Sequence, residues 1–526
     1  MTNKLKIMIK AVVIVTVFSI ITRALGFLFR IYLSWELGAE MLGLYQVAFS
    51  VLGVLVMLVS SGLPLALSKQ TAILKSSENK NGMWSATSAT LIISVALSII
   101  LCALIFLFQS PMSNIFADAR VMPILLTLLP AVIFSAIYSS FRGSLWGVKD
   151  FFGVSATEFI EQVVRILLFF LMANVLTTHL SGAINASVSF SMACFVSAVV
   201  AIVWYYLKGG RLKNPASQYR NILKSATPVT GVRVATSIIQ PLIAIIIPFE
   251  LIAIGFTKEL AIAEFGIAVG MTLPLLFLPS TLVGSLAMVL LPELSSDMHA
   301  KNHEKANTQI QAAFTFSIFI SMLIVPLYMG MSEDIGLFVY NNAKAGYYLL
   351  LSAWLMIPIA LSNISSTILN AMGLEGKSFK NYLFGAIFLI VCMFTLTRFI
   401  GILSLIVGMG GCMLISCMLN NRMIKKRLNI ETNILKKTAQ MALLAIPCLF
   451  LASNTLRVVG FFAPKFFALA FGSIVGAVAF IALCVIFRVL DLSMIILEIK
   501  NKKFSRRAPT KTPNDLKAVV DNMKNK

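Results

Sequence analysis

The chain has 526 residues, of which 59% are hydrophobic and 12% are charged, and its formal net charge is +22. A soluble protein carries about a quarter of its residues as charged side chains, so this composition excludes an ordinary soluble globular protein. Long apolar runs recur from end to end without the period-two alternation of barrel strands. The sequence therefore predicts an all-α integral membrane protein.

The apolar runs predict about 14 transmembrane helices, of which the first is too long for a signal peptide and is expected to stay as a span. Their ranges are 10–35, 42–68, 83–109, 121–146, 154–178, 182–207, 225–255, 265–292, 308–330, 345–371, 381–400, 402–421, 438–456 and 465–490.

The basic residues predict the orientation of these helices. If the N-terminus is cytoplasmic, most of the 43 lysines and arginines fall in loops or tails on the cytoplasmic side, as the positive-inside rule requires. We therefore expect a multi-pass protein of the cell membrane with both termini cytoplasmic. The excess of positive charge reflects topology, so we expect no nucleic-acid partner. The last residues, 514–523, are compatible with a short amphipathic helix or with a disordered tail.

Internal similarity suggests a duplicated design. AEMLGLYQ (39–46) resembles AEFGIAVG (263–270), and SSFRGSLWGVKD (139–150) resembles SSTILNAMGLEG (365–376). Both copies begin on the same side of the membrane, and transporters built from such repeats hold their substrate between the lobes. The predicted parts are two pseudo-repeated six-helix lobes, two appended helices and a basic cytoplasmic tail, at 1–220, 221–432, 433–491 and 492–526.

Two arginines interrupt the first apolar run, in the stretch ITRALGFLFR. Arg23 lies near the middle of the run, where a charge costs about 2.5–3.5 kcal/mol, and Arg30 follows nearly two turns later on almost the same face. Arg233 and Gln240 repeat this spacing in the second lobe. We predict that these four side chains line a cavity and bind substrate, with structural pairing of the arginines as the alternative.

A second polar group lies in the run TEFIEQVVRILLFF. Glu158, Glu161 and Arg165 share one helical face, and Glu161 and Arg165 have the favourable order for an ion pair. They are either a self-neutralising pair in the cavity wall or a group that couples transport to protons or cations. Glu250 is a weaker candidate for the coupling role.

The sequence carries no sign of an enzyme or of a bound cofactor. The stretch MGLEGKS lacks the first glycine of a P-loop, and no large soluble insertion is present. His299 and His303 have no further ligand nearby to complete a metal site. The segment QPLIAIIIP (240–248) is a plausible hinge, because each proline removes one helical hydrogen bond.

In their order along the chain, IITRALGFLFR, GLYQ, SSGLPLALSK, FRGSLWGVKDFFGVSATEFIEQVVRI and PLLFLPSTLVGSLAMVLLPELS resemble the stage V sporulation protein B family. That family belongs to the multidrug/oligosaccharidyl-lipid/polysaccharide (MOP) exporter superfamily. The resemblance implies a two-lobed, V-shaped bundle of 14 helices like that of MATE transporters and lipid II flippases. It also implies flipping of undecaprenyl-pyrophosphate-linked peptidoglycan precursor (lipid II-like) during spore cortex synthesis.

The resemblance carries over to the site only in part. Lipid II flippases have two functional arginines in their first helix, and Arg23 matches the first, whereas the spacing to Arg30 resembles the sporulation branch. Those flippases use their last two helices as a groove for the lipid tail. The predicted helices 438–456 and 465–490 match these two in number and position. Because arginine forks bind phosphate oxygens well, a lipid-linked oligosaccharide pyrophosphate is the expected partner.

Membrane lipids and cell-wall synthesis proteins are further expected partners. Proton, sodium or membrane-potential coupling is the expected energy source. Two alternatives stay open: a cation-coupled exporter of small molecules with the same fold, and a non-transporting scaffold for the cell-wall machinery.

Overall fold

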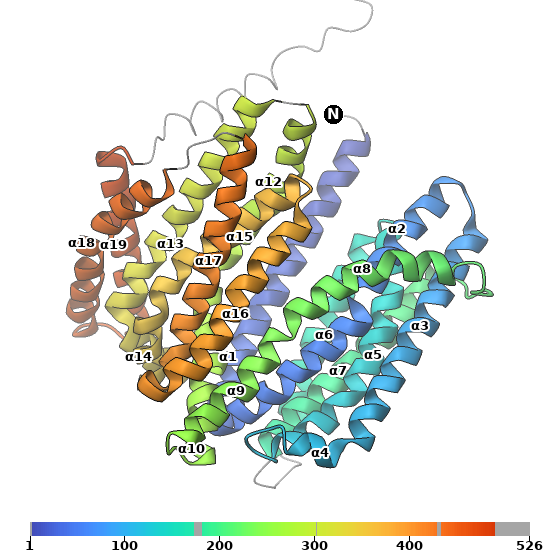
Figure 1. Cartoon of the computed structure of the whole chain (residues 1–526), viewed down its shortest axis with the longest axis horizontal. Helices are drawn as coiled ribbons and strands as arrows, with labels where there is room; N and C mark the ends of the chain where they lie inside the picture. The colour runs from blue at the N-terminus through green and yellow to red at the C-terminus, as the bar shows by residue number, and fades with distance from the viewer. Residues whose placement is uncertain (1–2, 173–180, 301, 429–432, 490–526) are drawn as a thin grey trace, which may run out of the picture. The chain divides into compact units, whose positions relative to one another are not determined.

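A computed structural model of the protein describes residues 3–172, 181–300, 302–428 and 433–489, and these residues contain helices and no strand (Figure 1). By length and composition, 12 helical segments are able to cross a membrane. One of them, Val17–Ser76, contains two predicted helices, and helix α6 (Phe151–Met172) supplies another. Each of the 14 predicted helices is therefore present, and the all-helical membrane fold is confirmed.

Helix α1 (Asn3–Ser60) is divided by a single glycine. Its 58 residues would extend about 87 Å if straight, almost three times the thickness of a bilayer core. Gly38 interrupts it with φ 68° and ψ −179°, a backbone conformation that a residue without Cβ adopts at little cost. The part before Gly38 contains the predicted arginines, and the part after it forms a separate segment.

Helix α5 lies at the centre of the first half, where it contacts α1, α2, α3 and α7 (Figure 1). Hydroxyl hydrogen bonds join α3 to α5, from Thr87 to Ser144 at 3.1 Å and between Ser94 and Ser140 at 2.9 Å. Small polar residues of this kind let membrane helices approach closely. Besides α1 and α6, the helices of this half are α2 (Gly62–Ser76), α3 (Lys80–Leu107), α4 (Gln109–Ser113), α5 (Val121–Gly147) and α7 (Ser181–Leu207).

The second half is more interrupted. Helix α8 ends just before Ile238 and α9 begins just after it, because Pro241 has no N–H to offer the carbonyl of Ser237. Its elements are α8 (Tyr219–Ser237), α9 (Ile239–Ala253), α10 (Lys258–Phe265), the π-helix η1 (Gly266–Thr272), α11 (Leu273–Phe277), α12 (Ser280–His299), α13 (His303–Tyr340), α14 (Ala343–Ser352), the 3₁₀-helix η2 (Ala353–Leu355), α15 (Met356–Ala371), α16 (Glu375–Ile400) and α17 (Leu403–Leu428).

The Ser-Ser pairs that align in the two halves both lie in contacts between helices. Ser140 bonds to Ser94 in the first half, and the amide of Asn420 donates to Ser365 and Ser366 in the second, at 3.2 and 3.1 Å. Asn420 also accepts a hydrogen bond of 2.8 Å from Asn381. The equivalent dipeptides therefore join helices in both halves.

The chain divides into two compact units, Met1–Ser321 with Met331–Thr432, and Met322–Gly330 with Asn433–Lys526. The second unit contains α18 (Ile434–Gly460), α19 (Lys465–Ile486) and a short part of α13. Its helices pack tightly, since a Cβ on Gly476 would lie 2.7 Å from the side chain of Leu327. The predicted amphipathic segment near the C-terminus lies outside the described residues.

Within the first unit, the two aligned segments 39–46 and 263–270 lie against each other. A Cβ on Gly43 would be 2.2 Å from the carbonyl oxygen of Ile262, and one on Gly266 would be 2.1 Å from that of Ala39. Only glycine permits backbones to approach this closely. We call this contact between α1 and the α10–η1 segment the glycine crossing.

Candidate anion-binding site

Arg30 reaches from α1 to the backbone of the π-helix η1. Its Nε donates to the carbonyl of Gly270 and its Nη2 to that of Val269, both at 3.3 Å. The local sequence explains why these carbonyls accept. The wide turn of η1 directs the amide of Leu273 to Ala268 rather than to Val269, and the α-helical partner of Gly270 would be Pro274, which has no N–H.

Arg165 of α6 occupies an aromatic pocket close to Arg30. Its Nη2 donates a hydrogen bond of 3.1 Å to the hydroxyl of Tyr45, and its guanidinium lies 5.2 Å from the ring centroid of Phe29 and 4.8 Å from that of Phe190. Aromatic faces attract a cation, but they do not neutralise it. The Nε of Arg165 is buried and has no hydrogen-bond partner among the described residues.

No carboxylate among the described residues lies within ion-pair distance of either arginine. Arg30 and Arg165 are close enough to repel each other, and Tyr45 and Tyr340 lie beside Arg30. Tyr340 is 3% exposed, and its hydroxyl has no hydrogen-bond partner among the described residues. An uncompensated charge inside a membrane protein is costly. The site, comprising Arg30, Arg165, Tyr45 and Tyr340, therefore offers two cations and unused donors to an anion.

The structure does not bring the other predicted substrate-binding residues into this site. Arg23, Arg233 and Gln240 are all exposed, and within the described part of the chain none of them has an ion-pair partner or a side-chain hydrogen bond. Arg23 lies on α1 nearly two turns from Arg30. Arg233 is on α8 and Gln240 on α9. Their predicted role in binding substrate stays a prediction.

The charged group of α6 is arranged differently from the expected ion pair. Glu158 pairs with Arg142 of α5 at 3.3 Å, and over the residues that the structure describes no ion pair joins Glu161 to Arg165. Glu161 faces the hydroxyl of Ser197 on α7, and its carboxylate still lies close enough to attract Arg165 without forming a direct ion pair. The helical phase that puts Glu161 and Arg165 on one face does not fix the direction of their side chains, and Arg165 turns toward its aromatic neighbours. Glu250 lies 3.9 Å from Arg398.

The sequence did not predict Tyr45, Tyr340, the carbonyls of η1 or the pairing of Arg142 as parts of a site. Two signals were present in the chain. Tyr45 lies inside the duplicated segment 39–46, and Pro274 closely follows two glycines in 263–270, a combination that weakens regular helical bonding. No pattern in the sequence reveals that the tyrosine at the end of α13 lies beside Arg30.

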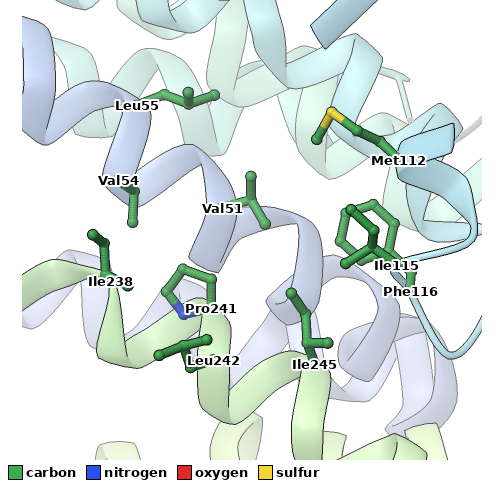
Figure 2. A pocket seen from close by; sticks show the side chains of 10 residues that line it. All are labelled: Val51, Val54, Leu55, Met112, Ile115, Phe116, Ile238, Pro241, Leu242 and Ile245. Carbon is green, nitrogen blue, oxygen red and sulfur yellow. The ribbon is translucent and has the colours of Figure 1, made fainter. Parts of the chain in front are cut away.

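A separate cavity of about 250 Å³ lies between α1, α4 and α9. Figure 2 shows Val51, Val54 and Leu55 from α1 opposite Pro241 and other apolar side chains at the start of α9. All its lining side chains are apolar. It adjoins the break between α8 and α9, and it offers no group that recognises a charged substrate.

The chain matches the family model described as "Polysaccharide biosynthesis protein" over residues 8–295, which is more than half of its length. Stage V sporulation protein B of Bacillus subtilis (strain 168) is 24% identical over 499 residues, covering 92% of this chain and 96% of that protein. Sporulation protein YkvU of the same organism is 20% identical over 440 residues, covering 80% and 96%.

Solved structures share the fold. A structure of the lipid II flippase MurJ in an inward closed conformation matches with a TM-score of 0.71 and 16% identity, over 90% of this chain and 98% of that one. An inward-facing MATE multidrug resistance transporter of the MOP superfamily matches with a TM-score of 0.67 and 16% identity, over 80% and 98%. The chain thus has the fold of these membrane transporters, and it belongs to the polysaccharide biosynthesis protein family.

Proposed function

We propose that this protein is a flippase that moves a lipid-linked saccharide pyrophosphate across the cell membrane by alternating access. The pair Arg30 and Arg165 carries the proposal, because two half-buried guanidinium groups lie close enough to repel each other, and neither forms an ion pair with a carboxylate of the described residues. A pyrophosphate supplies the missing negative charge, and its oxygens suit the planar donor fork of arginine. The lipid tail stays in the bilayer while the polar group crosses.

Alternating access is supported by the way the two halves of the first unit meet. Arg30 belongs to the first half and its carbonyl acceptors to the second. A ligand that draws Arg30 away from η1 would therefore weaken one contact between the halves. A ligand shifts a conformational equilibrium only through contacts that differ between the two states. If Arg30 gives up the η1 carbonyls and binds the substrate instead, the substrate directly changes the equilibrium between the two arrangements of the halves.

The proposed substrate is an undecaprenyl-pyrophosphate-linked peptidoglycan precursor, and the proposed setting is synthesis of the spore cortex. The names of two relatives support the setting, stage V sporulation protein B and sporulation protein YkvU. The shared fold with the lipid II flippase MurJ supports the substrate class. We propose a cytoplasmic location for both termini.

A flipping assay tests the proposal. Wild-type protein is reconstituted into vesicles with fluorescent lipid II, and transfer is followed by the loss of label to a membrane-impermeant quencher. Replacing a charged hydrogen-bond donor costs about 1.5–3 kcal/mol, so Arg165→Ala is expected to reduce transfer by at least about tenfold. Arg165→Lys keeps the charge but loses the fork, and it is expected to give an intermediate rate.

Arg427→Gln is the matched control, because it removes an exposed arginine in the last turn of α17 that has no part in the proposed site. Thermal melting of each variant shows whether it is folded. Wild-type transfer by folded Arg165→Ala and Arg30→Ala variants would overturn the role of this site. Arg23→Ala in the same assay tests whether the exposed arginine on α1 shares that role.

A further inference from the structure

An ion pair holds the second part of α1 to the start of α5. The Nη2 of Arg120 lies 2.7 Å from Oε1 of Glu40, and both side chains are about one-third exposed. Arg120 also donates to both carboxylate oxygens of Asp118, at 2.7–3.1 Å. Glu40 follows closely after the break at Gly38. The pair therefore links the beginning of one helical segment to the beginning of another.

A second ion pair holds α10 to α14 in the other half. The Nζ of Lys344 lies 2.5 Å from Oε1 of Glu264, and the hydroxyl of Tyr348 donates to the other carboxylate oxygen. Only 5% of the Glu264 side chain is exposed, against 59% of that of Lys344. A buried carboxylate is thus satisfied by one cation that reaches it from the surface.

The two ion pairs occupy equivalent positions in the duplicated sequence. Aligning AEMLGLYQ with AEFGIAVG places Glu40 on Glu264, and the same shift along the chain places Arg120 on Lys344. It also places Asp118 on Asn342. Both side chains accept a hydrogen bond from a backbone amide shortly after them in the chain. Asp118 accepts from Arg120 at 2.9 Å, and Asn342 accepts from Ala345 at 3.1 Å. Sequence position and charge therefore agree between the halves, while the turns differ by one residue, because Asp118 accepts from the second residue after it and Asn342 from the third.

Both carboxylates lie beside the glycine crossing. Glu40 is the neighbour of Ala39, whose carbonyl lies against Gly266, and Glu264 comes two residues before Gly266. The first ion pair ties its side of the crossing to α5, and the second ties the other side to α14. No ion pair within the described ranges spans the crossing itself.

We propose that Glu40–Arg120 and Glu264–Lys344 are repeat-related brackets that keep two helix ends of each half together, so that the halves separate along the glycine crossing. The movement of whole halves rests on the proposed alternating-access function. The mechanical role of the brackets does not, because it concerns the protein without substrate. Loss of one bracket frees its helix end and thereby loosens the crossing from that side.

Hydrogen–deuterium exchange of the full chain in lipid nanodiscs, without substrate, tests this proposal. Lys344→Gln removes the charge of the exposed partner, but the glutamine amide and the hydroxyl of Tyr348 can still donate to the buried Glu264, so the variant is expected to fold. Amide exchange in 258–266 and, across the crossing, in 39–46 is expected to rise by about three- to tenfold, the range for an opening made easier by about one kcal/mol. Lys344→Arg keeps the cation and is expected to restore slow exchange in both segments.

The matched control is Lys305→Gln, since Lys305 is 60% exposed and pairs at 3.0 Å with Asp297, which is 13% exposed. It removes a similar ion pair away from the crossing and is expected to leave both segments unchanged. Arg120→Gln should reproduce the effect from the other half. Unchanged exchange in Lys344→Gln, or a rise confined to 258–266, would overturn the brackets. Failure of the flipping assay alone would leave them standing.

Discussion

Gly266→Ala should destabilise the protein, although alanine is the better helix former. In a helix interior the exchange normally gains about 1 kcal/mol. At Gly266, however, the new Cβ would lie 2.1 Å from the carbonyl oxygen of Ala39 and 2.8 Å from the amide nitrogen of Gly43. Both are backbone atoms, so no side-chain rotation relieves the overlap. An ordinary contact begins near 3.4 Å, and the segments must part by about 1.3 Å.

Overpacking of this kind costs about 1–3 kcal/mol, and the separation also moves η1 relative to Arg30. We expect a lower melting temperature in detergent, followed by tryptophan fluorescence, and faster amide exchange in 39–46. Gly53→Ala is the control, because Gly53 lies in the same long helix and a Cβ added there would have no neighbour within 4 Å. It should be neutral or stabilising. Equal melting temperatures for the two variants would refute the close approach at the crossing.

Two further changes test single features. Burial raises the pKa of Asp118, but hydrogen bonds from Arg120 more than offset this and hold that pKa below its usual value of 3.8. The ionised carboxylate of Asp118 therefore stabilises the fold fully above pH 3.8, and this stabilisation is lost as the pH falls through the lowered pKa. The melting temperature of the wild type should fall for this reason between about pH 6 and 3, and that of Asp118→Asn should lack this fall. Pro241→Ala restores an N–H for Ser237, so amide exchange around Ile238 should slow, whereas unchanged exchange would mean that proline does not cause the break.

Composition and hydropathy were sufficient to predict the helices. A continuous apolar run in a bilayer must satisfy its backbone hydrogen bonds internally, and a helix does so. The position of the break in α1 follows from Gly38, whose φ of 68° suits glycine. The sequence similarity of 39–46 and 263–270 indicated a duplication. It did not indicate that the two copies touch, since similarity carries no information on distance.

The site was harder to predict for a physical reason. Sequence spacing places Glu161 and Arg165 on one face of α6, yet the partner of Arg165 is Tyr45 of α1. Tertiary packing decides which of several nearby donors and acceptors a long side chain uses, and it overrides a weak local pair. Arg30 was predicted as a ligand of substrate, but its carbonyl partners in η1 depend on a π-turn that hydropathy does not reveal.

The π-turn of η1 also affects the rotation about the helix axis of the segments that follow it, α11 and α12. A π-helical turn is an α-helix that carries one extra residue, and each residue of an α-helix corresponds to a rotation of about 100°. If η1 closed into a regular α-helix, the amide of Leu273 would claim the carbonyl of Val269 that Arg30 now uses. Arg30 thus occupies a carbonyl that a regular α-helix would need, and this contact links a guanidinium of one half to the helical phase of α11 and α12 in the other.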